Sequence, residues 1–247
     1  MTPTEGDFQR SWDELIRKAQ FAPKERPFAS LQDDLLAMME GFDMPGLPGR
    51  IPPGIYRQKG NRFNDLIGSL IRRKCGHNFI ERDVEGLTDR HKVDLVFPTK
   101  GSPEIAIEVK MAGRPEHVDE AGIKRPVRGG EVDFDKRLKE VKYTPTDLKL
   151  KYSGTTVKDW DSWIKESVPF FYTILGFFLG NPRRLDQTVE KFIRLARHYN
   201  NGVGVFLYLR EDDRYVRVHD HAGLRELQID DVIREVCRKA RRVAGSG

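Results

Sequence analysis

The stretch HKVDLVFPTKGSPEIAIEVK, residues 91–110, decides the fold because it holds two apolar alternations separated by a short Gly-containing loop. Over 91–98 and 104–110 an apolar side chain recurs at every second position, which is typical of half-buried β-strands. Each expected strand also carries an acid, Asp94 or Glu108, away from its apolar row. The stretch therefore predicts a β-hairpin that holds two carboxylates at fixed positions.

The register of this hairpin follows from the two apolar rows. A turn centred on Gly101 places Asp94 opposite Glu108 on one face, with Lys110 beside them. The apolar pairs on the other face are then Phe97 with Ile105, Leu95 with Ile107, and Val93 with Val109. Directly opposed residues have Cβ atoms only about 4.5–5.5 Å apart, so two like charges there are destabilising unless a cation lies between them.

A divalent cation and a lysine meet this requirement. Mg²⁺ prefers oxygen ligands, keeps several waters, and is commonly held by one or two carboxylates together with substrate phosphate. Asp94 and Glu108 are therefore expected to bind Mg²⁺, while Lys110 can orient or help to deprotonate an attacking water and stabilise developing negative charge. The alternative is a solvated hairpin face with a lysine salt bridge, but Val96 and Ala106 share that face and imply partial burial.

This pattern resembles the PD-(D/E)xK nuclease superfamily, whose members carry an acid on one strand and Glu/Asp-x-Lys on the next. The matching residues are Asp94 and the run Glu108-Val109-Lys110, with a valine in place of the proline, which is often absent in the family. The resemblance implies an α/β fold with a restriction-endonuclease-like αβββαβ core over roughly residues 61–210, a mixed central sheet flanked by helices, and an N-terminal helical segment. It also implies Mg²⁺-dependent hydrolysis of phosphodiester bonds by the three matching charged residues.

One position departs from the family pattern. Many members carry a further Glu on the helix before the strands, just after a buried aromatic residue. Here Phe63 is followed by Asn64 and Asp65. Asn64 is expected to offer a neutral ligand to the metal or to water, and Asp65 is the alternative after a small rotation of the helix. The number of metal ions therefore stays open.

Other motifs give weaker signals. A second Glu-Val-Lys occurs at 140–142, but the run DKRLKEVKYTP around it is charged and lacks the alternation of a strand. The pair His219 and His221 is more typical of a polar surface turn than of a metal site. No GxxxxGKS, strand-anchored GxGxxG or GxSxG motif is present, so phosphate-loop nucleotide binding and Ser/His/Asp hydrolysis are not supported.

Apolar spacing predicts the elements on either side of the hairpin. Two helices, over 7–20 and 28–42, are followed by a Pro/Gly-rich linker over 43–60 that is not expected to hold a regular element. This gives a helical lead-in over 1–60 and a core domain over 61–247. The elements expected in the core are a helix over 61–75 closed by Gly76, strands over 77–84, 202–209 and 214–220, and helices over 133–142, 158–180, 183–199 and 229–244.

Composition is typical of a soluble cytoplasmic protein. Charged residues make up 33% of the chain and hydrophobic residues 38%. The longest apolar run, VPFFYTILGFFLG over 168–180, is too short to span a bilayer and is interpreted as a buried helix. Only Cys75 and Cys237 are present, so neither a disulfide framework nor a zinc cage is supported. The first residues lack the basic-then-apolar pattern of a signal peptide, so a cytoplasmic location is expected.

Basic residues favour a nucleic-acid partner. The net charge of +5 permits polyanion binding without requiring it. The polar stretch 112–157 follows Lys110 directly and should lie near a bound phosphodiester, with an ordinary surface insertion as the alternative. Its side chains expected to contact phosphates or guanine edges are Arg114, Lys124, Arg125 and Arg128.

These observations together predict a Mg²⁺-dependent, sequence-specific endonuclease that acts on double-stranded DNA, similar to type II restriction endonucleases. A palindromic recognition site would require a symmetric homodimer. Two alternatives stay open. One is a repair or recombination nuclease that reads DNA structure, and the other is a non-catalytic DNA-binding module that retains a nuclease-like fold.

Overall fold

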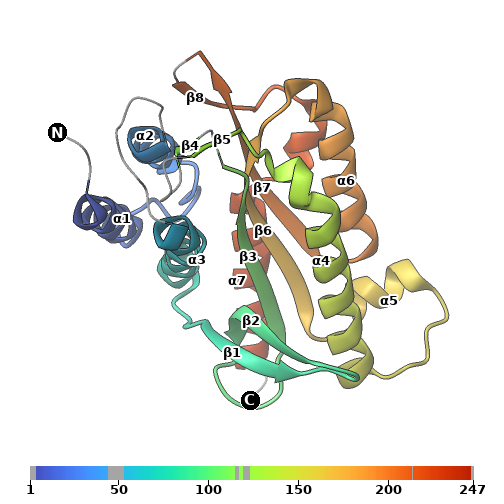
Figure 1. The fold of residues 1–247 in the computed structure, drawn as a ribbon. Coiled ribbons are helices and arrows are strands. Elements are labelled where there is room, and N and C mark those ends of the chain that lie inside the picture. Colours follow the sequence, from blue (N-terminus) through green and yellow to red (C-terminus); the bar gives the residue numbers. More distant parts are fainter. Residues whose placement is uncertain (1–3, 44–52, 115–116, 119–122, 213, 246–247) are drawn as a thin grey trace.

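The computed structural model describes residues 4–43, 53–114, 117–118, 123–212 and 214–245 (Figure 1). Within these ranges a six-stranded mixed sheet is flanked by helices. Its strands, in spatial order, are β1 (Ile80–Glu85), β2 (Arg90–Phe97), β3 (Ile105–Ala112), β6 (Phe170–Leu179), β7 (Gly202–Glu211) and β8 (Arg214–Arg217). The predicted α/β class, with a mixed sheet flanked by helices, is therefore confirmed.

The strand directions explain the helical crossovers. β1, β2 and β3 are antiparallel neighbours, β3, β6 and β7 run parallel, and β8 returns antiparallel to β7. Parallel neighbours need a long connection, which is usually helical. The connections carry α4 (Gly130–Ser153), α5 (Trp160–Glu166) and α6 (Leu185–His198). The short elements beside them are β4 (His117–Val118), β5 (Lys124–Arg125) and the 3₁₀ turns η1 (Pro182–Arg184) and η2 (Ala222–Glu226).

Each face of the sheet has its own helical layer (Figure 1). On one face lie α3 (Pro53–Cys75) and α7 (Ile229–Gly245), with α1 (Glu5–Ala19) and α2 (Gln32–Asp43) beside α3. The apolar stripe of α3, which is fully buried against this face, consists of Phe63, Leu66, Ile67, Leu70 and Ile71. On the other face α4 and α6 pack edge to face on β6 through the rings of Phe134, Phe177 and Phe192.

The N-terminal helices were expected as a lead-in, and they contribute to the main core. Trp12 of α1 and Leu35 of α2 are 0% exposed and belong to the same apolar cluster as α3 and α7. α3 begins at Pro53, so the expected absence of regular structure is wrong for residues 53–60, and residues 44–52 lie outside the described ranges. Proline is tolerated in the first helical turn because the N–H that it lacks has no partner there.

The apolar run 168–180 is not a helix. β6 spans Phe170–Leu179, and every residue after the first is buried. A strand that is covered on both faces has no polar side, so its sequence shows no two-residue alternation. The expected helix over 158–180 is therefore wrong beyond α5, which ends at Glu166.

The polar stretch after β3 holds more helix than expected. α4 runs from Gly130 to Ser153 and includes Pro145, so the predicted helix over 133–142 extends well beyond both of its expected ends. Residues 143–153 of the polar stretch, for which no element is predicted, are therefore helical as well. Among the described residues no helix is both long enough and apolar enough to cross a membrane.

Candidate active site

The hairpin of β2 and β3 has the predicted register. Its ladder pairs are Phe97 with Ile105, Val96 with Ala106, and Leu95 with Ile107. Gly101 lies in the loop with a φ of +80°, a conformation that glycine adopts without strain. The apolar rows therefore correctly predict how the two acid-bearing strands face each other.

A β-bulge changes the direction of side chains at the middle of β2. Between the pairs Ile80–Val96 and Arg82–Val93, β1 advances by two residues while β2 advances by three. Val93 and Val96 consequently lie in the same small apolar cluster, and the predicted pairing of Val93 with Val109 is wrong. Bulges are frequent beside functional sites, where they re-aim a side chain.

Asp94 lies in this bulge and is anchored to β3 by its side chain. Its Oδ2 accepts a hydrogen bond from the backbone N–H of Val109 at 2.8 Å. Asp94 and Glu108 do not form a ladder pair, so the predicted position of Asp94 directly opposite Glu108 is wrong, and the Asp94 carboxylate instead accepts a hydrogen bond from the backbone of β3. A carboxylate held by a backbone N–H has a fixed orientation, which a metal ligand or catalytic acid requires.

Lys110 connects the two acids. Its Nζ lies 2.7 Å from Asp94 Oδ2 and 2.6 Å from Glu108 Oε2. The structure therefore brings together the three charged residues that the sequence singles out. We refer to Asp94, Glu108 and Lys110 below as the acid–lysine cluster, and their catalytic role stays a prediction.

Burial sets the charge state of the cluster. Glu108 is 7% exposed, and this burial raises the pKa of its carboxyl to about 7, although the Lys110 ammonium opposes the shift. Burial also acts against the charged form of Lys110, but the two carboxylates outweigh it and raise the pKa of the amine. Lys110 is thus held as an ammonium ion, which favours charge stabilisation and water orientation over proton abstraction.

The cluster lies on the α4 side of the sheet and is partly open. Val96 and Ala106, which share its face, are 0% exposed and pack with Leu148 of α4. The Lys110 side chain keeps 30% of its surface exposed. The acids therefore lie at the edge of a buried apolar layer rather than on a fully solvated face, whereas the lysine salt bridge of the alternative is present.

The acid–lysine cluster fits a hard divalent cation. Asp94 and Glu108 already share one cationic group, and each presents oxygen, the donor that Mg²⁺ prefers. Among the described residues no group of three or more His, Cys, Asp or Glu side chains could hold a metal. Two carboxylates with water or phosphate as further ligands are a common environment of Mg²⁺, and binding of the ion here stays a prediction.

The two α3 candidates differ in their surroundings. Oδ1 of Asn64 is buried and accepts no hydrogen bond from any residue that the structure describes. Asp65 is exposed, and its charge interacts with Arg62 and with Asp13 of α1, so it points away from the sheet. α3 packs on the face of the sheet opposite the acid–lysine cluster, and no hydrogen bond within the described ranges joins Asn64 to that cluster, so the expected role of Asn64 stays a prediction.

The predicted DNA-contacting residues lie on a strand excursion between β3 and α4. Arg114 and Arg128 form an antiparallel bridge, in which each backbone N–H donates to the carbonyl oxygen of the other at 2.7 and 2.9 Å. Lys124 and Arg125 form β5, which pairs with β4. The Nε of Arg114 is buried without an acceptor among the described residues. All four therefore lie in short strand or bridge positions between β3 and α4, and their contact with DNA stays a prediction.

Sequence reasoning missed two polar residues beside Glu108. Thr173 of β6 is its neighbour across the parallel ladder, is 0% exposed, and donates its hydroxyl hydrogen to Asn200 Oδ1 at 2.8 Å. Asn200 is equally buried, and its Nδ2 has no acceptor in the described part of the chain. In the sequence, the one indication of these residues is a single threonine inside the apolar run of β6. That threonine is informative only when the run is recognised as a strand.

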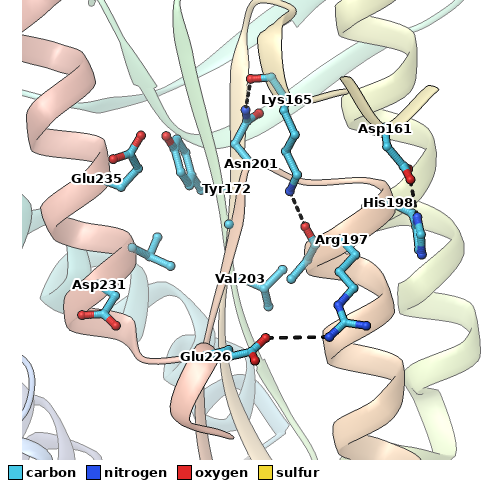
Figure 2. Close-up of a pocket in the computed structure, with 13 residues that line it drawn as sticks. Asp161, Lys165, Tyr172, Arg197, His198, Asn201, Val203, Glu226, Asp231 and Glu235 are labelled. Atoms are coloured by element: carbon cyan, nitrogen blue, oxygen red, sulfur yellow. Dashed lines mark hydrogen bonds and ion pairs between the residues drawn. The ribbon is translucent and has the colours of Figure 1, made fainter. Parts of the chain in front are cut away.

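A pocket of about 540 Å³ lies elsewhere, where β6 and β7 begin (Figure 2). Its lining includes Tyr172, Lys165 and Arg197 but no member of the acid–lysine cluster. Its charged groups are largely paired, since Asp161 lies 2.9 Å from His198 and Lys165 donates to two backbone carbonyls. The pocket is therefore separate from the candidate active site.

Comparison with models of protein families, with curated proteins and with solved structures gave no match to this chain.

Proposed function

We propose that this protein is a Mg²⁺-dependent nuclease that hydrolyses phosphodiester bonds of double-stranded DNA. The observation that carries the proposal is the convergence of Asp94 and Glu108 on Lys110 Nζ at 2.7 and 2.6 Å, beside a bulge in β2. The order α3, β1, β2, β3, α4, β6 supports it, because it follows the αβββαβ order of the PD-(D/E)xK superfamily.

The residues of the acid–lysine cluster would have different roles in phosphodiester hydrolysis. Asp94 and Glu108 would hold the metal, which when bound polarises the scissile phosphate and lowers the pKa of a coordinated water. The Val109 N–H fixes the Asp94 carboxylate, so it need not reorganise during the reaction. The Lys110 ammonium hydrogen-bonds to the attacking water or a phosphate oxygen and stabilises the negative charge that develops there.

The proposal also includes recognition of a specific DNA sequence. The excursion that carries Arg114 and Arg128 leaves the end of β3 two residues after Lys110, so it starts beside the proposed chemistry. Arginine reads guanine through bidentate hydrogen bonds in the major groove and also binds phosphates. We therefore propose sequence-specific cleavage of the type II restriction kind, by a homodimer at palindromic sites.

The decisive experiment incubates purified protein with a long DNA of known sequence and Mg²⁺. Cleavage should fall by at least about 100-fold in Lys110→Ala and in Asp94→Asn, because each removes a group that acts on the transition state. Lys92→Ala is the matched control, since Lys92 lies on the same strand as Asp94 and pairs at the surface with Glu81 at 3.0 Å. The control should cleave like the unmodified protein.

The products select among the functions considered. Discrete bands support site-specific cleavage, whereas a smear points to an unspecific nuclease. Cleavage confined to junction or mismatch substrates points to a structure-reading enzyme. Intact DNA that is nevertheless bound identifies a non-catalytic module, and cleavage that survives in both cluster variants rules out the proposed site.

A further inference from the structure

The two cysteines of the chain lie side by side although they are far apart in sequence. Cys75 is the last residue of α3, and Cys237 lies in the middle of α7. Both sulfurs approach one acceptor, the carbonyl oxygen of Ile71, at 3.0 Å from Cys75 Sγ and 4.0 Å from Cys237 Sγ. The two sulfurs therefore share one acceptor at the contact between α3 and α7. Their neighbourhood is created by the packing of α3 on α7.

The surroundings of the pair are basic. The hydrogen bond from the Cys237 thiol lowers the pKa of Cys75, and the charge of Arg241 lowers it further. The hydrogen bond with Cys75 and burial raise the pKa of Cys237, and the charges of Arg241 and Lys74 oppose this shift. Lys74 and Arg241 belong to two basic runs that the proposed nuclease function does not use, 72–74 and 238–242.

The two thiols differ in access to solvent. Cys75 is partly exposed, whereas Cys237 is 1% exposed and forms part of the main core. A small oxidant therefore reaches Cys75 first, and the sheltered Cys237 is positioned to react with the product. An accessible thiol of lowered pKa beside a second thiol is the arrangement of redox-sensitive cysteine pairs.

We propose that Cys75 and Cys237 form a peroxide-sensitive dithiol that closes reversibly to a disulfide between α3 and α7. The Cys75 thiolate attacks hydrogen peroxide, breaks its O–O bond and becomes a sulfenic acid while hydroxide leaves. The Cys237 sulfur then attacks the sulfenic sulfur, forming the S–S bond and releasing water. The two thiols lose two electrons in total, and the peroxide is reduced to two waters.

The experiment treats the reduced full chain with hydrogen peroxide, blocks free thiols with N-ethylmaleimide, and maps peptides by mass spectrometry without reductant. The expected product is a linked pair of peptides containing Cys75 and Cys237, in a monomer that has lost the mass of two hydrogens. Dithiothreitol should restore both thiols. In Cys237→Ser the sulfenic acid on Cys75 should persist and react with dimedone.

Two arginine variants test whether nearby positive charge speeds the oxidation of Cys75. Arg241→Gln should slow disulfide formation about threefold at low salt, because it removes a positive charge beside the thiolate. Arg238→Gln is the matched control, since Arg238 pairs with Glu235 at 2.5 Å, and its rate should stay unchanged. Two results would overturn the proposal. One is oxidation of Cys75 while Cys237 still reacts with the alkylating reagent after unfolding, and the other is a disulfide between the Cys75 residues of two molecules.

Discussion

At the scale of the residue, the raised pKa of Glu108 makes the stability of the protein depend on pH. Its folded-state pKa of about 7 lies above the ordinary value of 4.5, so between these values the folded protein holds a proton that the unfolded chain has released. The free energy of unfolding should therefore fall as pH rises through this window, by about 1–3 kcal/mol from this group.

Glu108→Gln should remove this component, because an amide does not titrate. Urea unfolding at intervals between pH 5 and pH 8 should show the variant gaining stability relative to the unmodified protein as pH rises. Glu81→Gln, whose exposed side chain lies on β1 at the edge of the same sheet, is the matched control and should follow the unmodified curve. Parallel curves for Glu108→Gln and the unmodified protein would show that burial does not shift this carboxyl.

The sequence predicts the residues of the cluster but not the detail that orients them. Alternation and a Gly-centred loop are local patterns, so they correctly predict the pairing of Leu95 with Ile107. The bulge that re-aims Asp94 depends on the pairing of β2 with β1, which the residue types around Asp94 do not reveal. Asn200 escaped notice for a similar reason, since only the fold places it beside Thr173.

At the scale of the element, the errors fall where burial removes periodicity. β6 was interpreted as a helix because its run is apolar throughout, and length alone does not separate a buried helix from a central strand. Elements with one solvated face were predicted well. α7, whose apolar and charged residues occupy opposite faces, spans Ile229–Gly245 against an expected 229–244. β7 is buried on both faces like β6, yet its run correctly predicts a strand, which spans Gly202–Glu211 against an expected 202–209.

Lys149 gives a test of how these elements are joined. It is 0% exposed on α4, and its Nζ donates to the Ser167 carbonyl at 2.6 Å and to Asn201 Oδ1 at 3.0 Å. Burial, with Lys165 and Lys239 nearby, lowers the pKa of this amine to about 7. It thereby connects α4 to the residues that precede β6 and β7.

The sign of its pH effect is opposite to that of Glu108. Between pH 7 and pH 10 the unfolded chain keeps a proton on Lys149 that the folded protein has lost, so stability should rise with pH. Across this pH range the free energy of unfolding of the unmodified protein should rise by on the order of 2–4 kcal/mol relative to that of Lys149→Met. Chemical unfolding at several pH values measures the difference, and Lys151→Met, at an exposed position of α4, should show none.

At the scale of the whole molecule, the N-terminal helices pack as part of the core that supports the hairpin. α1 begins with a capping box between Thr4 and Asp7, which specifies its start from local sequence. Its inner face packs against α2 and α3, and Trp12 is 0% exposed there. Apolar periodicity marks that face in the sequence but does not say which element covers it.

Trp12→Ala should therefore destabilise the entire molecule rather than detach α1 alone. Removing a fully buried indole costs about 3–5 kcal/mol, which is a large part of the free energy of unfolding of a typical domain. Phe21→Ala is the matched control, because Phe21 is 78% exposed and its loss should change stability by less than about 0.5 kcal/mol. Circular dichroism and the fluorescence of the remaining tryptophans should report one shared, earlier transition in Trp12→Ala. An early loss of helical signal, followed by a second transition at the original midpoint, would instead show that the lead-in unfolds independently of the sheet.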